Sequence, residues 1–277
     1  MRAEAKGECV VCSASGSSDP QPMPNRFVLE ICVESVDHAV AAERGGAHRI
    51  ELCSDLSSGG ITPSAGLMQT TRRHVRVPIH VLIRPRAGNF CYSDHELEIM
   101  RNDIHAAKQF GMDGIVLGIL HKSTRVDIER TKALVELAHP LPVTFHRAFD
   151  ASENLETSLE EVIQTGASRI LTSGGQPRAT DGLSTLARLA QAARGRILLM
   201  PGGGINSKNV VRIVRTTLAQ EFHTSVGTSH PGSTGKGSSL SRGNDVTRSS
   251  LHSALFEQKV AKLVSLLGSV FHDGGVS

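Results

Sequence analysis

Short apolar runs alternate with longer amphipathic stretches along most of the chain. The runs have the length and the aliphatic residues of buried strands, and the stretches repeat apolar positions with the period of a helix. The predicted strands cover residues 27–33, 49–53, 79–85, 114–120, 142–148, 169–173, 197–200 and 221–225. The predicted helices follow them at about residues 35–45, 64–74, 94–110, 128–138, 155–165, 183–193, 208–216 and 256–267.

Strands that alternate with helices predict parallel βαβ units with right-handed crossovers. Units of this number in 277 residues fit an α/β fold of the TIM type, a closed (β/α)8 barrel, better than an open doubly wound sheet. We expect a single barrel domain over residues 27–277 after a disordered tail at residues 1–26. The Ser- and Gly-rich stretch at about 226–253 is predicted to be a long loop before the last helix.

Strand parity predicts which side chains enter the barrel, because successive side chains point to opposite faces. On the first strand the apolar residues Leu29, Ile31 and Val33 share one parity and are expected to face the helices. The same rule places a mostly polar set inside, namely Glu30, Cys32, Glu51, Cys53, His80, Leu82, Arg84, Arg86, Thr144, His146 and His223. Burial of single charges is costly, so we expect these groups to be paired.

Two interpretations of the charged interior residues stay open. The fifth predicted strand brings His146 and, just beyond it, Asp150 to its carboxyl end, where barrels usually bind ligands. In the first interpretation, Glu30 and Glu51 form a structural network with Arg84. In the second, Glu30, Glu51, Arg84 and His146 form a catalytic site in which His146 is the acid or base.

Two cysteines occupy matching positions on the first two predicted strands. Residues 30–32 and 51–53 both have the pattern Glu-x-Cys, and neighbouring strands lie only about 4.8 Å apart. Cys32 and Cys53 are therefore candidate metal ligands, and soft thiolates suit Cu(I). The alternative is that both are small core residues, a common role for a free buried cysteine.

A glycine-rich turn follows the seventh predicted strand. Gly202, Gly203 and Gly204 open a helix there, at the position where many barrels bind phosphate. Ser173 ends the preceding strand and can add a hydroxyl to the same site. These residues form a candidate anion site, unless the glycines only make a tight turn.

Composition narrows the classes of function. The chain has 30 basic and 27 acidic residues, a balance that gives no nucleic-acid-binding footprint. The absence of a signal peptide and of a long apolar segment predicts a soluble intracellular protein without a membrane span. The five cysteines are then expected to be reduced thiols, with Cys9 and Cys12 in the disordered tail.

Several stretches together resemble the CutC copper homeostasis family, and its animal-type members in particular. The matching stretches cover residues 29–35, 45–53, 59–64, 83–86, 142–150, 171–174 and 200–205. The resemblance implies a TIM-like barrel, a cytoplasmic and also nuclear location, a homo-oligomer (tetramer or dimer) and a link to copper. It also implies that Cys32 and Cys53 are the Cu(I) ligands.

Three functions compete at this stage. The leading hypothesis is an intracellular copper homeostasis protein that binds a copper ion, as Cu(I), through the barrel cysteines. The alternative is a TIM-barrel enzyme that acts on a small anionic or phosphorylated ligand, with the reaction unassigned. The third is a scaffold whose barrel is structural and whose outer face mediates assembly.

Overall fold

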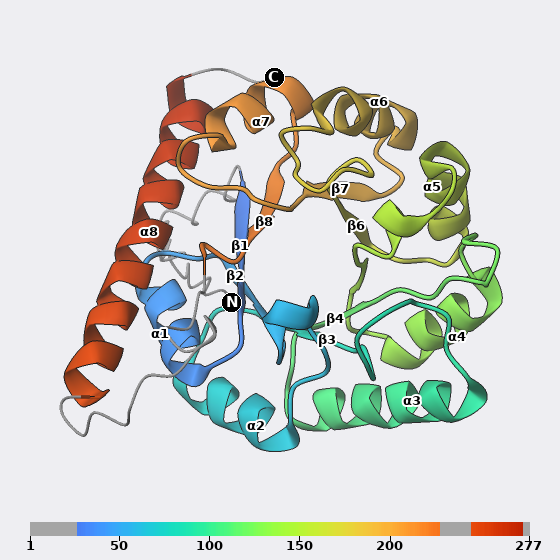
Figure 1. The fold of residues 1–277 in the computed structure, drawn as a ribbon, viewed down its shortest axis with the longest axis horizontal. Helices are drawn as coiled ribbons and strands as arrows, with labels where there is room; N and C mark the ends of the chain where they lie inside the picture. Colours follow the sequence, from blue (N-terminus) through green and yellow to red (C-terminus); the bar gives the residue numbers. More distant parts are fainter. Residues whose placement is uncertain (1–26, 228–244, 274–277) are drawn as a thin grey trace, which may run out of the picture.

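Eight parallel strands surround the barrel interior, and helices alternate with them along the chain (Figure 1). The computed structural model describes residues 27–227 and 245–273, so the predicted tail with Cys9 and Cys12 lies outside the described residues. The strands are β1 Val28–Val33, β2 Arg49–Leu52, β3 Ile79–Leu82, β4 Gly114–Leu117, β5 Val143–Phe145, β6 Arg169–Thr172, β7 Leu198–Pro201 and β8 Glu221–Thr224. The helices are α1 Val36–Arg44, α2 Ala65–His74, α3 Asp94–Gln109, α4 Ile128–Ala138, α5 Leu155–Gln164, α6 Leu183–Ala193, α7 Val210–Thr217 and α8 Asp245–Asp273. Two short 3₁₀ helices lie at η1 Leu56–Ser58 and η2 Phe149–Ala151.

The barrel closes between its first and last strands and again between β7 and β8. The strand order is β7-β6-β5-β4-β3-β2-β1-β8, and a single parallel bridge between Gly202 and His223 joins the remaining edges. A side chain on Gly202 would collide with Leu171 and would place a Cβ 3.4 Å from the Cβ of His223. The glycine thus allows the close backbone approach that completes the predicted TIM-type barrel.

The helices pack on the outward parity of the strands, as predicted. Leu29, Ile31 and Val33 are fully buried on that face, and burial of each such side chain contributes about 1.5–3 kcal/mol.

Ser35 caps α1 by accepting a hydrogen bond from the His38 amide at 3.2 Å, which satisfies a free backbone donor at the start of the helix. No helix within residues 27–227 and 245–273 is long and apolar enough to cross a membrane.

Some predicted bounds were wrong. Strands β3, β4 and β5 end before the predicted residues 85, 120 and 148. On β3 the cause is local, because the Arg84 amide donates to the Thr62 hydroxyl at 2.9 Å instead of extending the ladder. Arg86, predicted to face inward, therefore lies beyond the strand and pairs with Glu96 of α3.

The last helix starts earlier than the predicted residue 256. Helix α8 begins at Asp245, so the predicted loop at 226–253 is shorter than expected, and residues 228–244 lie outside the described residues. Ser and Thr lower helix propensity only slightly. Packing of Phe256, Val260 and Leu263, all buried, stabilises the helix beyond what local propensity predicts.

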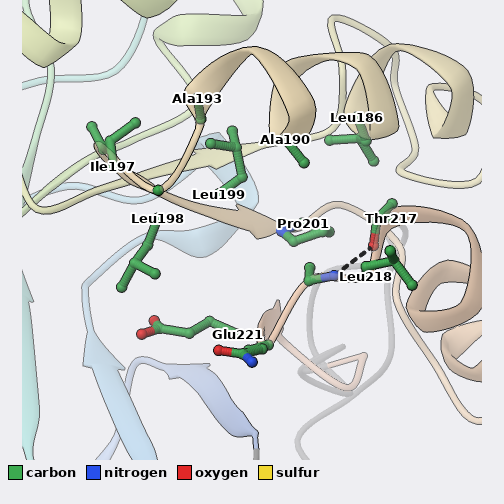
Figure 2. A pocket seen from close by; sticks show the side chains of 13 residues that line it. Leu186, Ala190, Ala193, Ile197, Leu198, Leu199, Pro201, Thr217, Leu218 and Glu221 are labelled. Carbon is green, nitrogen blue, oxygen red and sulfur yellow. Dashed lines mark hydrogen bonds between the residues drawn. The ribbon is translucent and has the colours of Figure 1, made fainter. Parts of the chain in front are cut away.

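An apolar groove lies where β7 and β8 separate, at the amino-terminal end of the barrel (Figure 2). Its volume is about 220 Å³, and Leu198 and Leu218 at its mouth are 44% and 62% exposed. Glu221 also lines it. The groove therefore lies at the opposite end of the strands from the predicted site.

Candidate functional site

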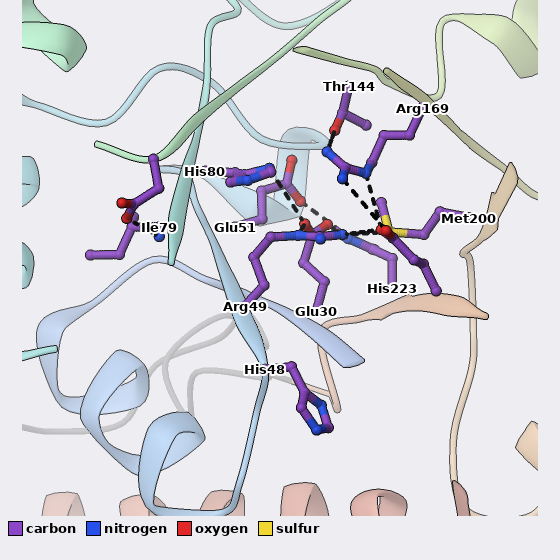
Figure 3. A network of polar contacts seen from close by, with 12 residues as sticks. Glu30, His48, Arg49, Glu51, Ile79, His80, Thr144, Arg169, Met200 and His223 are labelled. Carbon is purple, nitrogen blue, oxygen red and sulfur yellow. Dashed lines mark hydrogen bonds and ion pairs between the residues drawn. The ribbon is translucent and has the colours of Figure 1, made fainter. Parts of the chain in front are cut away.

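Two arginines and two glutamates form a fully paired set inside the barrel (Figure 3). Arg49 bridges Glu30 and Glu221, with its Nη2 2.6 Å from the Glu221 carboxylate. Arg169 binds the same Glu221 oxygen, Oε2, at 3.0 Å and donates to the Thr144 hydroxyl at 3.3 Å. We call Glu30, Arg49, Arg169 and Glu221 the ionic layer. Mutual pairing of this kind is what makes buried charge tolerable.

His223 joins the ionic layer to the next level of the barrel. Its Nδ1 lies 2.7 Å from Glu30, and its Nε2 lies 3.3 Å from Glu51. Burial opposes protonation of the imidazole, but the Glu51 and Glu30 carboxylates outweigh it and raise the His223 pKa. Burial raises the pKa of Glu51, whereas Arg49 and His223 overcome burial and lower that of Glu30. The position of His223 between Glu30 and Glu51 thus favours its protonated form.

The two predicted metal ligands lie side by side above this level. The Sγ atoms of Cys32 and Cys53 are 3.5 Å apart, and both side chains are buried. Leu82 and Val116 pack against them, which gives the thiols an apolar wall. The strand register explains the approach, because Cys32 pairs with Glu51 and Cys53 follows two residues later on the same inward parity.

Further ligand atoms surround Cys32. The ligand atoms of Cys32, Glu51 and His223 all lie within 4.8 Å of one another. The hydrogen bond with Cys53 and then burial raise the pKa of Cys32 well above its usual value. The Cys32 thiol is therefore held in its neutral form, and a metal must displace its proton to bind.

Arg84 holds in place the loops that cover the thiols. Its guanidinium donates to the carbonyls of Ser58 at 3.2 Å and Gly60 at 2.7 Å, and to Gly88 at 2.8 Å. These carbonyls belong to the loops after β2 and β3, and a side chain on Gly60 would clash with Leu82. The predicted structural network of Glu30 and Glu51 with Arg84 is therefore wrong, because the guanidinium lies beyond the strand end, where loop carbonyls satisfy it.

His146 lies inside the upper end of the barrel, by which we mean the carboxyl ends of the strands. Gly118 makes room for it, since a Cβ there would lie 2.5 Å from the ring. Burial, aided by the Arg84 charge, lowers the pKa of His146 to about 3. Gly114 makes room for His80 in the same way, and burial lowers the pKa of His80 to about 3 as well. Both imidazoles are neutral.

The predicted catalytic residues therefore fall into separate groups. Glu30 and Glu51 contact His223, whereas Arg84 acts on His146 and binds loop carbonyls. The assignment of Glu30, Glu51, Arg84 and His146 as one catalytic set stays a prediction.

An internal carboxylate occupies part of the predicted anion site. Asp150 accepts hydrogen bonds from the Ser173 amide at 3.0 Å, the Ser173 hydroxyl at 3.0 Å and the Gly175 amide at 2.9 Å. It also accepts from Thr172 at 2.6 Å and pairs with Arg147 at 2.8 Å. The nest of backbone donors exists, but a residue of the chain itself fills the part beside Ser173.

The glycines of the predicted anion site have different roles. Gly202 closes the barrel, as described above. Gly203 and Gly204 have φ angles of +98° and +71°, which only glycine adopts readily. A Cβ on Gly203 would lie 3.4 Å from an Arg147 nitrogen, so this turn borders a cation. Anion binding at Gly203 and Gly204 stays a prediction.

Sequence reasoning missed the two interior arginines and the role of Asp150. Arg49 shares the inward parity of Glu51, and Arg169 starts its strand, so strand parity contained the signal for both. Each stands at the first position of a predicted strand, where the bounds are least certain. Asp150 was placed near the right strand end, but nothing in its spacing indicated which amides it would bind.

The fold and this interior identify the protein as a (β/α)8 barrel with a buried ionic layer and a thiol pair near its upper end. The model of the CutC family matches residues 27–228. Proteins named copper homeostasis protein cutC homolog from Homo sapiens and Mus musculus are each 50% identical over 201 residues, 73% of this chain and 74% of the relative. The chain belongs to the CutC family.

Solved structures agree with this assignment. The crystal structure of the putative copper homeostasis protein CutC from Streptococcus agalactiae has a TM-score of 0.69 and 32% identity, over 72% of this chain and 98% of that chain. A Rubisco-like protein from Rhodopseudomonas palustris, with a TM-score of 0.58 and 15% identity over 89% of this chain and 65% of that chain, shares the fold alone.

Proposed function

We propose that this chain is a copper homeostasis protein that binds Cu(I) through the thiolates of Cys32 and Cys53. The observation that carries the proposal is the 3.5 Å separation of the two sulfur atoms inside the barrel. Thiolates are soft ligands that favour Cu(I) over harder ions. The names of the human and mouse relatives support a role in copper homeostasis.

Metal binding at this site requires the loss of thiol protons. The Cys32 pKa is raised, so a neutral thiol is the resting form, and the affinity for Cu(I) should increase with pH. Glu51 and His223 lie within reach of the same sulfur. Glu51 can accept a released proton, and both groups can add a further ligand, His223 once it has lost its own proton.

Entry of the metal requires movement of the cover. Cys53 is fully buried and Cys32 is only 3% exposed, while Leu56 packs over them from η1. The loop that carries Leu56 is held by the two Arg84 hydrogen bonds to Ser58 and Gly60. Opening of this loop is the route by which a copper donor can reach the sulfurs.

A competition titration tests the proposal. The protein would be titrated anaerobically with Cu(I) against a chromophoric Cu(I) chelator, in a background with Cys9→Ser and Cys12→Ser. We expect tight binding that is lost when Cys32→Ser and Cys53→Ser are added. The matched control is Cys91→Ser, a half-buried free thiol away from the pair, which should leave the affinity unchanged. Equal affinity with and without the thiol pair would overturn the proposal.

The cellular location and the assembly remain predictions of the resemblance. A cytoplasmic and nuclear distribution is testable by imaging of the tagged full-length chain. A homo-oligomer, tetramer or dimer, is testable by analytical ultracentrifugation.

The alternative function, an enzyme acting on a small anionic substrate, is favoured by unpaired groups at the upper end of the barrel.

A further inference from the structure

Three buried polar atoms at the upper end of the barrel have no hydrogen-bond partner among the described residues. They are Nε of Arg84, the hydroxyl oxygen of Tyr92 and Nε2 of His146. A buried group left unpaired costs about 1–3 kcal/mol, and native structures seldom leave one without a reason. We call Arg84, Tyr92 and His146 the donor cluster.

The donor cluster gathers around one aromatic ring. The Arg84 guanidinium lies 5.0 Å from the centroid of the Phe90 ring, and the His146 ring lies 5.0 Å from it. Burial raises the pKa of the Tyr92 hydroxyl to about 12, and the Arg84 guanidinium counters part of that rise by its charge and by its close contact with the hydroxyl. Arg84, Phe90 and Tyr92 come from the loop after β3, and His146 directly follows β5, so two segments distant in sequence meet here.

The unpaired nitrogens of the cluster are both donors. Nδ1 of His146 accepts the Ala148 amide hydrogen at 3.2 Å, so in the neutral ring Nε2 carries the proton. Nε of Arg84 is also a donor, and the Tyr92 hydroxyl can donate as well. A group with several acceptor oxygens is the complement of this arrangement, and a negative charge on it would be stabilised by the guanidinium.

A cavity with a volume of about 300 Å³ borders the same aromatic ring. Phe90 lines it and lies between it and the Arg84 and His146 side chains that contact the ring. His121, Lys122 and Thr124 also line it, so its rim is polar and carries at least one positive charge. This volume suits a small metabolite, and the upper end of a barrel is where such ligands bind.

We propose that the upper end of the barrel binds a small molecule bearing a carboxylate or phosphate group, whose oxygens accept hydrogen bonds from Arg84 Nε and His146 Nε2. Phe90 forms the wall between the cavity and these donors, and its displacement exposes them to the ligand. Lys122 attracts the anion at the rim. This site uses no atom of the thiol pair and stands independently of copper binding.

An NMR titration with inorganic phosphate and with acetate tests the proposal. Histidine would be labelled with ¹⁵N, and the His146 signals identified by their loss in His146→Gln. We expect a saturable shift of the His146 Nε2 signal with one of the two anions, which assigns the class of ligand. Chloride at the same ionic strength is the control. The absence of a saturable shift with either anion would overturn the proposal and would indicate that solvent alone satisfies the donors.

Variants separate this site from a general charge effect. Arg84→Gln should weaken binding about tenfold or more, and Lys122→Ala about two- to fivefold. The exposed Lys132→Ala on α4 is the matched control and should have no effect. If Arg84→Gln does not fold, the Lys122 and Lys132 pair and the wild-type titration still decide. Equal weakening by Lys122→Ala and Lys132→Ala would count against the cavity as the route. The same anion titration repeated in Cys32→Ser with Cys53→Ser should be unchanged, which separates this proposal from the copper proposal.

Discussion

The ionic layer and the upper end of the barrel are both polar and both buried, but they differ in how their groups are satisfied. In the ionic layer each charge has a partner, for example Glu221 between Arg49 and Arg169. At the upper end, Arg84 and His146 keep unpaired donors, and the thiol pair has only weak sulfur contacts. A buried charge that is paired is therefore weak evidence for a functional site. A buried polar group without a partner, beneath a loop that covers it, is stronger evidence.

The first prediction breaks the ionic layer. Arg49→Met keeps an unbranched side chain but leaves Glu30 and Glu221 without the cation that bridges them. We expect a loss of about 3–5 kcal/mol in the free energy of unfolding, measured by urea denaturation. Arg188→Met, which removes an exposed pair with Glu156, should cost no more than about 0.5 kcal/mol. Similar losses in the two variants would show that the ionic layer is not structural.

The second prediction concerns the carboxylate in the backbone nest. Asp150→Ala leaves the donors of Ser173 and Gly175 unpaired, so we expect a loss of about 2–3 kcal/mol in stability. Added sulfate should restore part of it by binding in the emptied nest, as a rise in the urea midpoint. The exposed Asp181→Ala is the control for the general effect of sulfate. A midpoint rise of the same size in both variants would contradict the role of Asp150 as an internal anion.

The third prediction is a pH dependence. The folded-state pKa of His80 is about 3, against an ordinary value of 6.5, because burial and the Arg49 and Arg169 charges outweigh the attraction of Glu30. Below about pH 6.5 His80 is protonated in the unfolded chain but stays neutral in the folded chain. The free energy of unfolding therefore falls as the pH falls towards about 3. His80→Gln should reduce this slope by up to about 1.4 kcal/mol per pH unit. Denaturation midpoints between these pH values measure the slope, and equal slopes in His80→Gln and in the exposed His95→Gln would contradict it.

Strand parity predicted much of the barrel and its interior. The alternation of apolar and polar positions on β1 and β2 placed Glu30, Glu51 and both cysteines inside, because the period of a strand is fixed. The hydrogen-bond and ion-pair partners of these interior side chains could not be predicted in this way. Arg84 lies where the ladder gives way to a loop, and its partners are backbone carbonyls, which carry no residue identity.

The turn predicted to bind an anion shows the same limit. The glycines after β7 predicted exposed backbone donors, and Gly203 adopts a positive φ angle that glycine alone adopts readily. Which acceptor fills the nest depends on how η2 brings Asp150 against β6, a tertiary contact that local sequence does not encode. Sequence pattern therefore identifies the residue types of a site more reliably than their partners.

The most direct test of the central proposal is copper X-ray absorption spectroscopy on Cu(I)-loaded protein. The sample would carry Cys9→Ser, Cys12→Ser and Cys91→Ser, so that Cys32 and Cys53 are the remaining thiols of the five in the chain. The proposal predicts a first shell that contains two sulfur neighbours, lost when both are replaced by serine. A first shell of only nitrogen or oxygen, the same before and after that replacement, would contradict it.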